Sequence, residues 1–95
     1  MQYEWDGAKA ALNLRKHGVD FVDAIAALED PNRLEEIDTR LVYGEERLQV
    51  IGSAKGAVLL VVTTSRDDGV RRIISARKAT RHEQDRYYAR DRETW

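Results

Sequence analysis

The first third of the chain has the apolar spacing of helices. Asp6 is a good N-cap for a run of strong helix formers, and the run ends at Gly18, which suits the left-handed position after a helix. A second helix is predicted from Asp20, because the apolar residues after it occupy positions 0, 3, 4 and 7 of one stripe: Phe21, Ala24, Ile25 and Leu28. The pair Asp30-Pro31 ends this helix. A short strand over residues 2–5 is predicted before the first helix.

From residue 33 the pattern changes to that of strands. This part of the chain holds four candidate strands, at residues 34–41, 48–52, 58–64 and 70–76. The segments between them are typical of turns: residues 43–45, Lys55-Gly56 and Asp67-Asp68-Gly69. The strand at 58–64 is the most β-branched and apolar, which predicts the centre of a sheet.

Thr80 and Glu83 form a T-x-x-E capping box, which predicts a third helix from about Arg81 towards Arg92. The expected order is a short strand, two helices, three to four antiparallel strands and a C-terminal helix. Because the helices are segregated from the hairpins, the predicted fold class is α+β, with the helices packed across a twisted sheet. No repeat or linker interrupts the 95 residues, so we expect one domain over residues 1–95.

Composition excludes several classes of protein. The chain has no cysteine, which excludes disulfides, zinc–thiolate sites and cysteine nucleophiles and fits a reducing cytoplasm, the localisation that we expect. The longest apolar run, residues 57–62, is far shorter than a membrane span. The chain has no phosphate-binding glycine loop, H-E-x-x-H motif or nucleophile elbow, and its two histidines lie far apart in sequence. We therefore expect no metal and no cofactor.

Charge is distributed unevenly along the chain, although the net charge is only −1. Residues 1–50 hold 11 acids and 6 bases, whereas residues 51–95 hold 6 acids and 10 bases. Halves of opposite sign indicate an interaction surface on the basic half. A solvated surface of mixed charge is the alternative.

Cations are concentrated on the last strand and helix: Arg66, Arg71, Arg72, Arg77, Lys78, Arg81, Arg86, Arg90 and Arg92. Strand alternation places two groups on opposite faces, namely Arg72, Ile74 and Ala76 on one and Ile73, Ser75 and Arg77 on the other. An arginine on a covered face must find an anion or a carboxylate. Two interpretations stay open: a bound phosphate, or an ion pair with Glu83 or an N-terminal acid.

His17 also has two interpretations. It lies at a predicted helix end beside Gly18, where its ring could cap terminal carbonyls. A histidine is also suited to proton transfer near neutral pH. We expect His82 to be exposed and Trp5 to pack against a helix.

Two segments of the chain are similar to one known family. The first contains Tyr3-Glu4-Trp5-Asp6, Lys9, Asn13, Lys16-His17-Gly18-Val19, Phe21, Ala24 and Asp30-Pro31. The second contains Gly44-Glu45-Glu46-Arg47, Ile51-Gly52, Arg72-Ile73-Ile74-Ser75-Ala76-Arg77-Lys78-Ala79, Glu83 and Tyr87. Together they resemble BrnT toxins over about residues 3–88, with Tyr3 and Leu28 where that family more often has Phe.

The resemblance implies a RelE-like fold and the toxin of a type II toxin–antitoxin pair, which cleaves RNA and inhibits translation. The partners that it implies are an RNA substrate and a BrnA-type antitoxin, a small DNA-binding protein. The toxin–antitoxin complex of that family represses its own operon, so contact with operator DNA is expected only through the antitoxin. No membrane partner is expected.

A metal-independent endoribonuclease agrees with these residues. RNA supplies its own nucleophile, the 2′-hydroxyl, so the protein has to position the chain, move protons and stabilise charge. We assign charge stabilisation to Arg72 and Arg77, and proton transfer to Glu83 or His17. Further RNA contacts are expected from Lys16, Arg47, Arg66 and Arg81. The alternatives are a non-catalytic binding module and a decayed toxin that keeps only its partner-binding surface in operon autoregulation.

Overall fold

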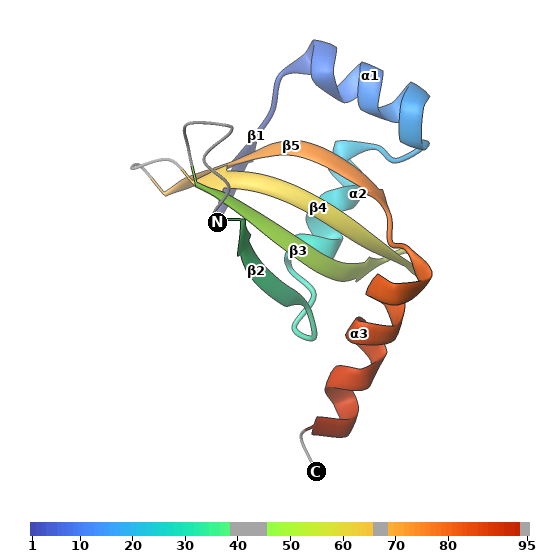
Figure 1. The fold of residues 1–95 in the computed structure, drawn as a ribbon. Coiled ribbons are helices and arrows are strands. Elements are labelled where there is room, and N and C mark those ends of the chain that lie inside the picture. Colours follow the sequence, from blue (N-terminus) through green and yellow to red (C-terminus); the bar gives the residue numbers. More distant parts are fainter. Residues whose placement is uncertain (39–45, 66–68, 94–95) are drawn as a thin grey trace.

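The computed structural model describes residues 1–38, 46–65 and 69–93, with side chains to residue 89. The elements follow in the order β1 (Gln2–Glu4), α1 (Gly7–His17), α2 (Phe21–Leu28), β2 (Leu34–Asp38), β3 (Arg47–Ala54), β4 (Ala57–Ser65), β5 (Val70–Lys78) and α3 (Arg81–Glu93) (Figure 1). The three helices and five strands of these described residues confirm the predicted α+β class. The third helix begins at Arg81, as its capping box predicts.

The five strands form one sheet in the order β1-β5-β4-β3-β2 (Figure 1). Strands β2 to β5 are antiparallel neighbours, and β1 adds to β5 as a parallel strand. The most β-branched segment, β4, lies at the centre as predicted. Because β1 pairs only with residues 70–72, the rest of β5 is an edge of the sheet.

Local caps explain where the first two helices begin and end. The Asp6 carboxylate accepts from the N–H groups of Ala8 and Lys9, at 2.8 and 3.3 Å, and these bonds lower the pKa of Asp6. Gly18 has φ 71° and donates its N–H to the Leu14 carbonyl at 2.8 Å. Asp20 caps α2 through the N–H of Val22 at 2.9 Å. The helix boundaries predicted from these residues are confirmed.

The two faces of the sheet carry separate apolar clusters. Helix α2 packs on one face, where Phe21 and Ala24 are fully buried and Trp5 meets the Phe21 ring edge-on at 6.1 Å. Trp5 therefore packs against a helix, as expected. Gly52 allows the close approach of α2, because a Cβ there would lie 2.2 Å from the Ala27 carbonyl oxygen. Helix α3 covers part of the opposite face through Tyr87.

Asp30 connects α3 to the rest of the fold. One of its carboxylate oxygens, Oδ2, accepts from the Ser53 N–H at 2.8 Å and from the Tyr87 hydroxyl. The other oxygen, Oδ1, accepts from the Asn32 N–H at 2.9 Å. The Asp30-Pro31 pair, which predicted only a helix end, thus also fixes the last helix.

Turns agree with the prediction where the structure describes them. Lys55 and Gly56 have φ of 51° and 79° and join β3 to β4. Gly69 has φ 81°, while the other residues of its predicted turn lie outside the described residues. The predicted turn at 43–45 and the end of the predicted strand beyond Asp38 also lie outside them.

A β-bulge in β5 overturns one prediction. Val62 of β4 pairs with Ser75, but the next residue, Thr63, pairs with Ile73, so Ile74 is an extra residue on β5. Ile73 and Ala76 consequently share the buried α2-side cluster, although alternation predicts opposite faces. The prediction was wrong because alternation assumes an uninterrupted register.

The same bulge brings two arginines onto one face. Arg72 pairs with Thr64 of β4, and Arg77 pairs with Leu60. Thr64 and Leu60 are four residues apart on one strand and therefore point to the same side. Arg72 and Arg77, predicted on opposite faces, thus share the face that α3 partly covers, which we call the α3 face.

Candidate functional site

The α3 face is built from cross-strand rows of side chains. One row contains Glu4, Arg72 and Thr64. The next contains Ser75, Val62, Gln49 and Glu36, and the third contains Arg77, Leu60, Ile51 and Leu34. The cluster around Tyr87 of α3 includes Leu60, Ile51 and Leu34, so α3 packs over the third row. Ser75 therefore lies between Arg72 and Arg77, at the edge of the sheet.

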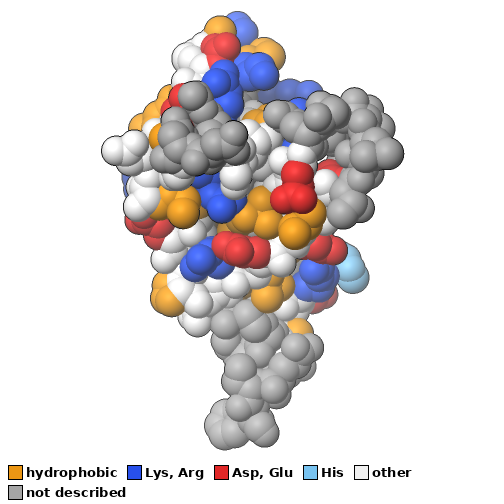
Figure 2. Space-filling model, turned by 90° about the vertical axis from the view of Figure 1, so that its left-hand side faces the viewer, with side chains coloured by type: hydrophobic (Ala, Val, Ile, Leu, Met, Phe, Trp, Pro, Cys, Tyr) orange, Lys and Arg blue, Asp and Glu red, His pale blue; other side chains and the backbone are white. Residues whose placement is uncertain are grey.

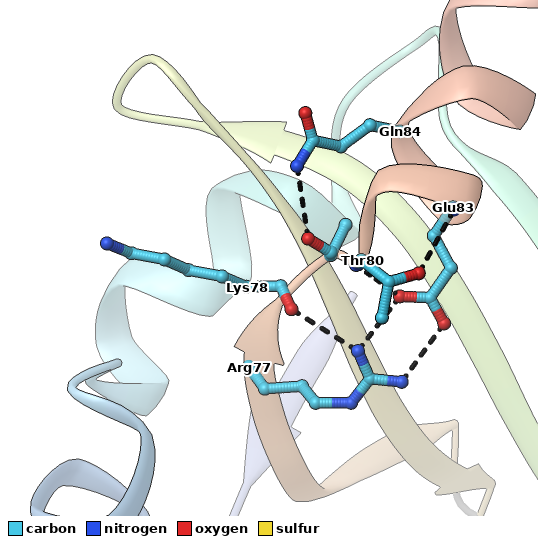
Figure 3. Close-up of polar contacts among 6 residues, drawn as sticks. Arg77, Lys78, Thr80, Glu83 and Gln84 are labelled. Carbon is cyan, nitrogen blue, oxygen red and sulfur yellow. Dashed lines mark hydrogen bonds and ion pairs between the residues drawn. The ribbon is translucent and has the colours of Figure 1, made fainter.

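Arg77 and Glu83 form a bidentate ion pair at the junction of β5 and α3 (Figure 3). The Nη1 and Nη2 groups of Arg77 donate to the two carboxylate oxygens of Glu83 at 2.8 and 3.0 Å. Nη1 also donates to the Lys78 carbonyl at 3.2 Å. These bonds use three of the five N–H groups of a guanidinium, which leaves Nε–H and one N–H of Nη2 for another acceptor. The arginine side chain is 36% exposed.

Glu83 also closes the predicted capping box. Its carboxylate accepts from the Thr80 N–H at 2.8 Å, and its own N–H donates to the Thr80 hydroxyl at 3.2 Å. The hydrogen bonds from Arg77, together with that from Thr80, lower the pKa of Glu83 from 4.5 to about 2, although burial opposes the shift. The pKa of Arg77 is raised, mainly by its hydrogen bonds to Glu83. Glu83 is therefore an ionised carboxylate at neutral pH.

Arg72 is held more loosely. Its Nη1 lies 3.9 Å from Oε1 of Glu4 on the neighbouring parallel strand. Its side chain is 40% exposed. The sequence left open an ion pair with Glu83 or an N-terminal acid, and the structure contains one of each kind.

Arg47 lies at the start of β3, opposite Asp38 of β2. It is two residues from Gln49, so the strand alternation places it on the α3 face as well. The face therefore gathers three of the predicted site arginines, Arg47, Arg72 and Arg77. The α3 face also carries acids, because Glu4 and Glu36 lie in its cross-strand rows. On the side of the molecule shown in Figure 2, blue and red side chains likewise lie next to one another.

Lys16 and His17 lie elsewhere, at the end of α1. They line a groove of about 280 Å³ between α1 and the edge of β5, which we call the α1–β5 groove. Its other lining residues are Lys9, Leu12, Asn13, Ile74 and Ser75. The His17 ring forms no hydrogen bond with the described residues, so the predicted capping role finds no support; Gly18 provides the cap instead.

Asn13 is the functional-site residue whose role the sequence reasoning missed. It is 7% exposed, and its amide Nδ2 donates to the carbonyls of Val19 and Ala76 at 3.0 and 2.8 Å. Its Oδ1 accepts from the Ala76 N–H at 3.2 Å. The amide thus pairs with the open edge of β5 as a neighbouring strand would. The available signal was a polar residue on the helix stripe that faces the sheet, with Ala10 and His17.

Arg81 lies in neither of these two places. Arg81 is exposed on α3 and lies 3.4 Å from Asp85, and Arg66 lies outside the described residues. His82 is exposed, as expected. Within the described ranges, no three His, Asp or Glu residues are grouped to hold a metal ion, and no helix has the length and apolarity to cross a membrane.

Comparison with known families defines the class of protein. A family described as "Ribonuclease toxin, BrnT, of type II toxin-antitoxin system" matches residues 5–83. The fold and this match define a ribonuclease toxin of a type II toxin–antitoxin system. The chain belongs to the BrnT family, which confirms the resemblance found in the sequence, and membership implies an antitoxin as partner.

A solved structure supports this assignment. The chain is similar to the ribonuclease toxin BrnT of Brucella abortus, known from a crystal structure at 1.1 Å resolution. The TM-score is 0.62 and the identity 26%, over 85% of this chain and 99% of the other. Comparison with curated proteins finds no match.

Proposed function

We propose that the protein is a metal-independent endoribonuclease that inhibits translation and is neutralised by a BrnA-type antitoxin. The observation that carries the proposal is the bulge at Ile74, which brings Arg72 and Arg77 to one face of the sheet with Ser75 between them. Two guanidinium groups on one face suit a phosphate that gains charge during reaction, because each presents paired N–H donors to phosphate oxygens.

The reaction needs no protein nucleophile. The 2′-oxygen of RNA forms a bond to the adjacent phosphorus, while the bond from phosphorus to the 5′-oxygen breaks. One proton leaves the 2′-hydroxyl, and another is delivered to the departing 5′-oxygen. Arg72 and Arg77 stabilise the negative charge on the phosphate oxygens between these events.

Arg77 is suited to this role in spite of its ion pair. Glu83 and the Lys78 carbonyl leave two N–H groups of the guanidinium for phosphate. The carboxylate fixes the orientation of the guanidinium, which lowers the entropy lost when a phosphate binds. We therefore assign Glu83 to positioning Arg77.

Proton transfer falls to His17 in this proposal. A carboxylate whose pKa is about 2 is a weak proton acceptor at neutral pH, which argues against Glu83 as the general base. His17 lines the α1–β5 groove together with Ser75, which borders the α3 face. His17 is half-buried, and its ring forms no hydrogen bond with the described residues that a ligand would have to break.

The remaining cations serve RNA binding. Arg47 shares the α3 face and Lys16 lines the groove, and we add Arg66 and Arg81 as further phosphate contacts. Operator DNA is contacted only through the antitoxin, and the complex acts in the cytoplasm, in keeping with a chain that lacks cysteine.

Purified toxin, free of antitoxin, tests the proposal. Incubated with RNA in the presence of a chelator, it should cleave, and its induced expression should arrest growth. Intact RNA, with ribosomes also tested, would contradict the enzymatic proposal.

A second function is favoured by the same ion pairs. Arg77 and Arg72 both face carboxylates, as expected for a binding module whose arginines serve structure. This module, or a decayed toxin, would bind the antitoxin without cleaving RNA. Growth arrest after induction without the antitoxin distinguishes the toxin from both.

A further inference from the structure

The α1–β5 groove is larger than the proposed reaction requires, and most of its lining residues have no part in that reaction. Its volume of about 280 Å³ is close to the lower end of small-ligand sites, roughly 300 Å³. Leu12 of α1 and Ile74, the bulged residue of β5, supply apolar walls. Leu12 is 55% exposed, so its side chain is accessible to a ligand in the groove.

The groove is held open by buried hydrogen bonds. Asn13 donates both amide hydrogens to the carbonyls of Val19 and Ala76, and its amide oxygen accepts from the Ala76 N–H. These bonds fix the spacing between α1 and the edge of β5. A ligand therefore meets a groove whose shape is already set, and little ordering entropy is lost on binding.

The helix wall is positively charged. Helix α1 contains Lys9, Arg15 and Lys16 and no acidic residue, and none of these cations forms an ion pair within the described parts of the chain. Lys9 and Lys16 line the groove, about 10 Å apart along the helix axis. The spacing leaves room for one flat apolar group between two anion-binding side chains.

The groove is continuous with the α3 face. Ser75 lines the groove and lies in the cross-strand row between those of Arg72 and Arg77. A chain that lies across the edge of β5 at this residue passes from the arginines to α1. His17 lines the part of this path that lies in the α1–β5 groove.

We propose that the α1–β5 groove is a nucleotide-binding subsite, which holds one unpaired base of single-stranded RNA next to the phosphate bound by Arg72 and Arg77. The base lies between Leu12 and Ile74, and Lys9 and Lys16 bind the flanking phosphates. A duplex does not fit, because its bases are paired and stacked. This proposal rests on the proposed ribonuclease function and gives its substrate class as unpaired RNA.

Matched variants on α1 test whether the groove is a nucleotide-binding subsite. Lys16→Glu is paired with Arg15→Glu, an exposed cation in the same helical turn that does not line the groove. Leu12→Asp is paired with Leu14→Asp, since Leu14 is 47% exposed and also lies outside the lining. The probe is a short fluorescein-labelled single-stranded RNA that carries 2′-O-methyl groups and cannot be cleaved by its own 2′-oxygen. Anisotropy gives the Kd, and unlabelled RNA gives the cleavage rate.

We expect Lys16→Glu and Leu12→Asp each to raise the Kd about tenfold or more, while their controls stay within about twofold. The Lys16 variant should also lose about 0.7 from the slope of log affinity against log salt, because one phosphate contact is gone. If each groove variant binds RNA as tightly as its control and the protein still cleaves RNA, the nucleotide-binding subsite is excluded. The ribonuclease proposal is then unaffected. If Leu12→Asp keeps RNA binding and cleavage but loses antitoxin binding, the groove is a protein-docking surface. That result would also contradict the proposal. An unmodified protein that neither binds nor cleaves RNA would overturn both.

Discussion

The cations around α3 and those on α1 lie in contrasting surroundings. Three arginines at or on α3 each meet a carboxylate, in the pairs Arg77–Glu83, Arg81–Asp85 and Arg86–Glu36. On α1, Lys9, Arg15 and Lys16 form no ion pair within the described residues. Each region thus supplies three of these cations, but only those on α1 have no carboxylate partner among the described residues.

Pairing changes what each region offers a ligand. An arginine that is already bonded to a carboxylate is oriented and partly neutralised, so it is suited to placing a phosphate more than to attracting one. An unpaired lysine on a helix attracts phosphates but positions them loosely. The two regions thus divide the proposed work, with β5 and α3 placing the reacting phosphate and α1 holding the neighbouring nucleotide.

The largest expected effect follows from removing the oriented arginine. Arg77→Ala should lower the rate of RNA cleavage by roughly 10²–10³ and abolish growth arrest, because a donor to the reacting phosphate is lost. The fold should survive, since Glu83 keeps its capping bonds to Thr80. Arg86→Ala, which breaks a more exposed ion pair between α3 and Glu36, is the control and should keep its activity. A soluble Arg77 variant with unchanged melting temperature and full toxicity would exclude a catalytic role.

The next effect concerns His17. His17→Asn keeps a hydrogen-bonding side chain and removes the imidazole, so the cleavage rate should fall at least about tenfold. The melting temperature should not change, because Gly18 provides the helix cap. A His17→Asn variant that cleaves RNA within about twofold of the rate of the unmodified protein would exclude the role of His17.

Asn13 tests whether α1 is held by its amide. Asn13→Ala leaves three buried backbone groups of Val19 and Ala76 without partners, so the free energy of unfolding should fall by about 1–3 kcal/mol. Urea denaturation measures this loss. Leu14→Ala, on the exposed side of the same helix, should change the value by less than about 0.5 kcal/mol. Equal losses for both variants would mean that the amide bonds contribute no specific stability.

The smallest effect is the pH dependence of the Arg77–Glu83 pair. Because folding lowers the pKa of Glu83 from 4.5 to about 2, its carboxylate contributes stability that is fully present above about pH 4.5 and is lost as the pH falls towards 2. Glu83→Gln should therefore be less stable than the unmodified protein at pH 7, and the difference should shrink over this interval. Unfolding free energies measured at several pH values give the result. A difference that stays constant down to pH 2 would mean that the carboxylate charge is not what stabilises the pair.

Local signals predicted most of the fold. Caps at Asp6, Gly18 and Thr80 fixed the helices, and β-branched content identified β4 as the centre of the sheet. The bulge at Ile74 was not predictable, because an extra residue in β5 leaves no mark in an alternating pattern. For this reason the sequence identified Arg72 and Arg77 but assigned them to opposite faces.

Contacts between segments that are distant in sequence limited how much of the site could be predicted. The capping box and the ion pair of Glu83 with Arg77 lie within six residues and were within reach of the sequence. The bonds from Asn13 to Ala76 span 63 residues, and no local pattern reports them. The α1–β5 groove depends on such contacts, so Lys16 and His17 were identified as single residues and not as parts of one groove.

The chemistry of the RNA ends tests the central claim most directly. If the RNA's own 2′-hydroxyl attacks the phosphate that Arg72 and Arg77 hold, purified protein with excess chelator should leave 2′,3′-cyclic phosphate and 5′-hydroxyl ends. These ends are distinguished by mass spectrometry of a defined single-stranded RNA, with Arg77→Ala as the matched sample that accumulates them slowly. Products that carry 5′-phosphate, or cleavage that stops when the chelator is added, would contradict the account.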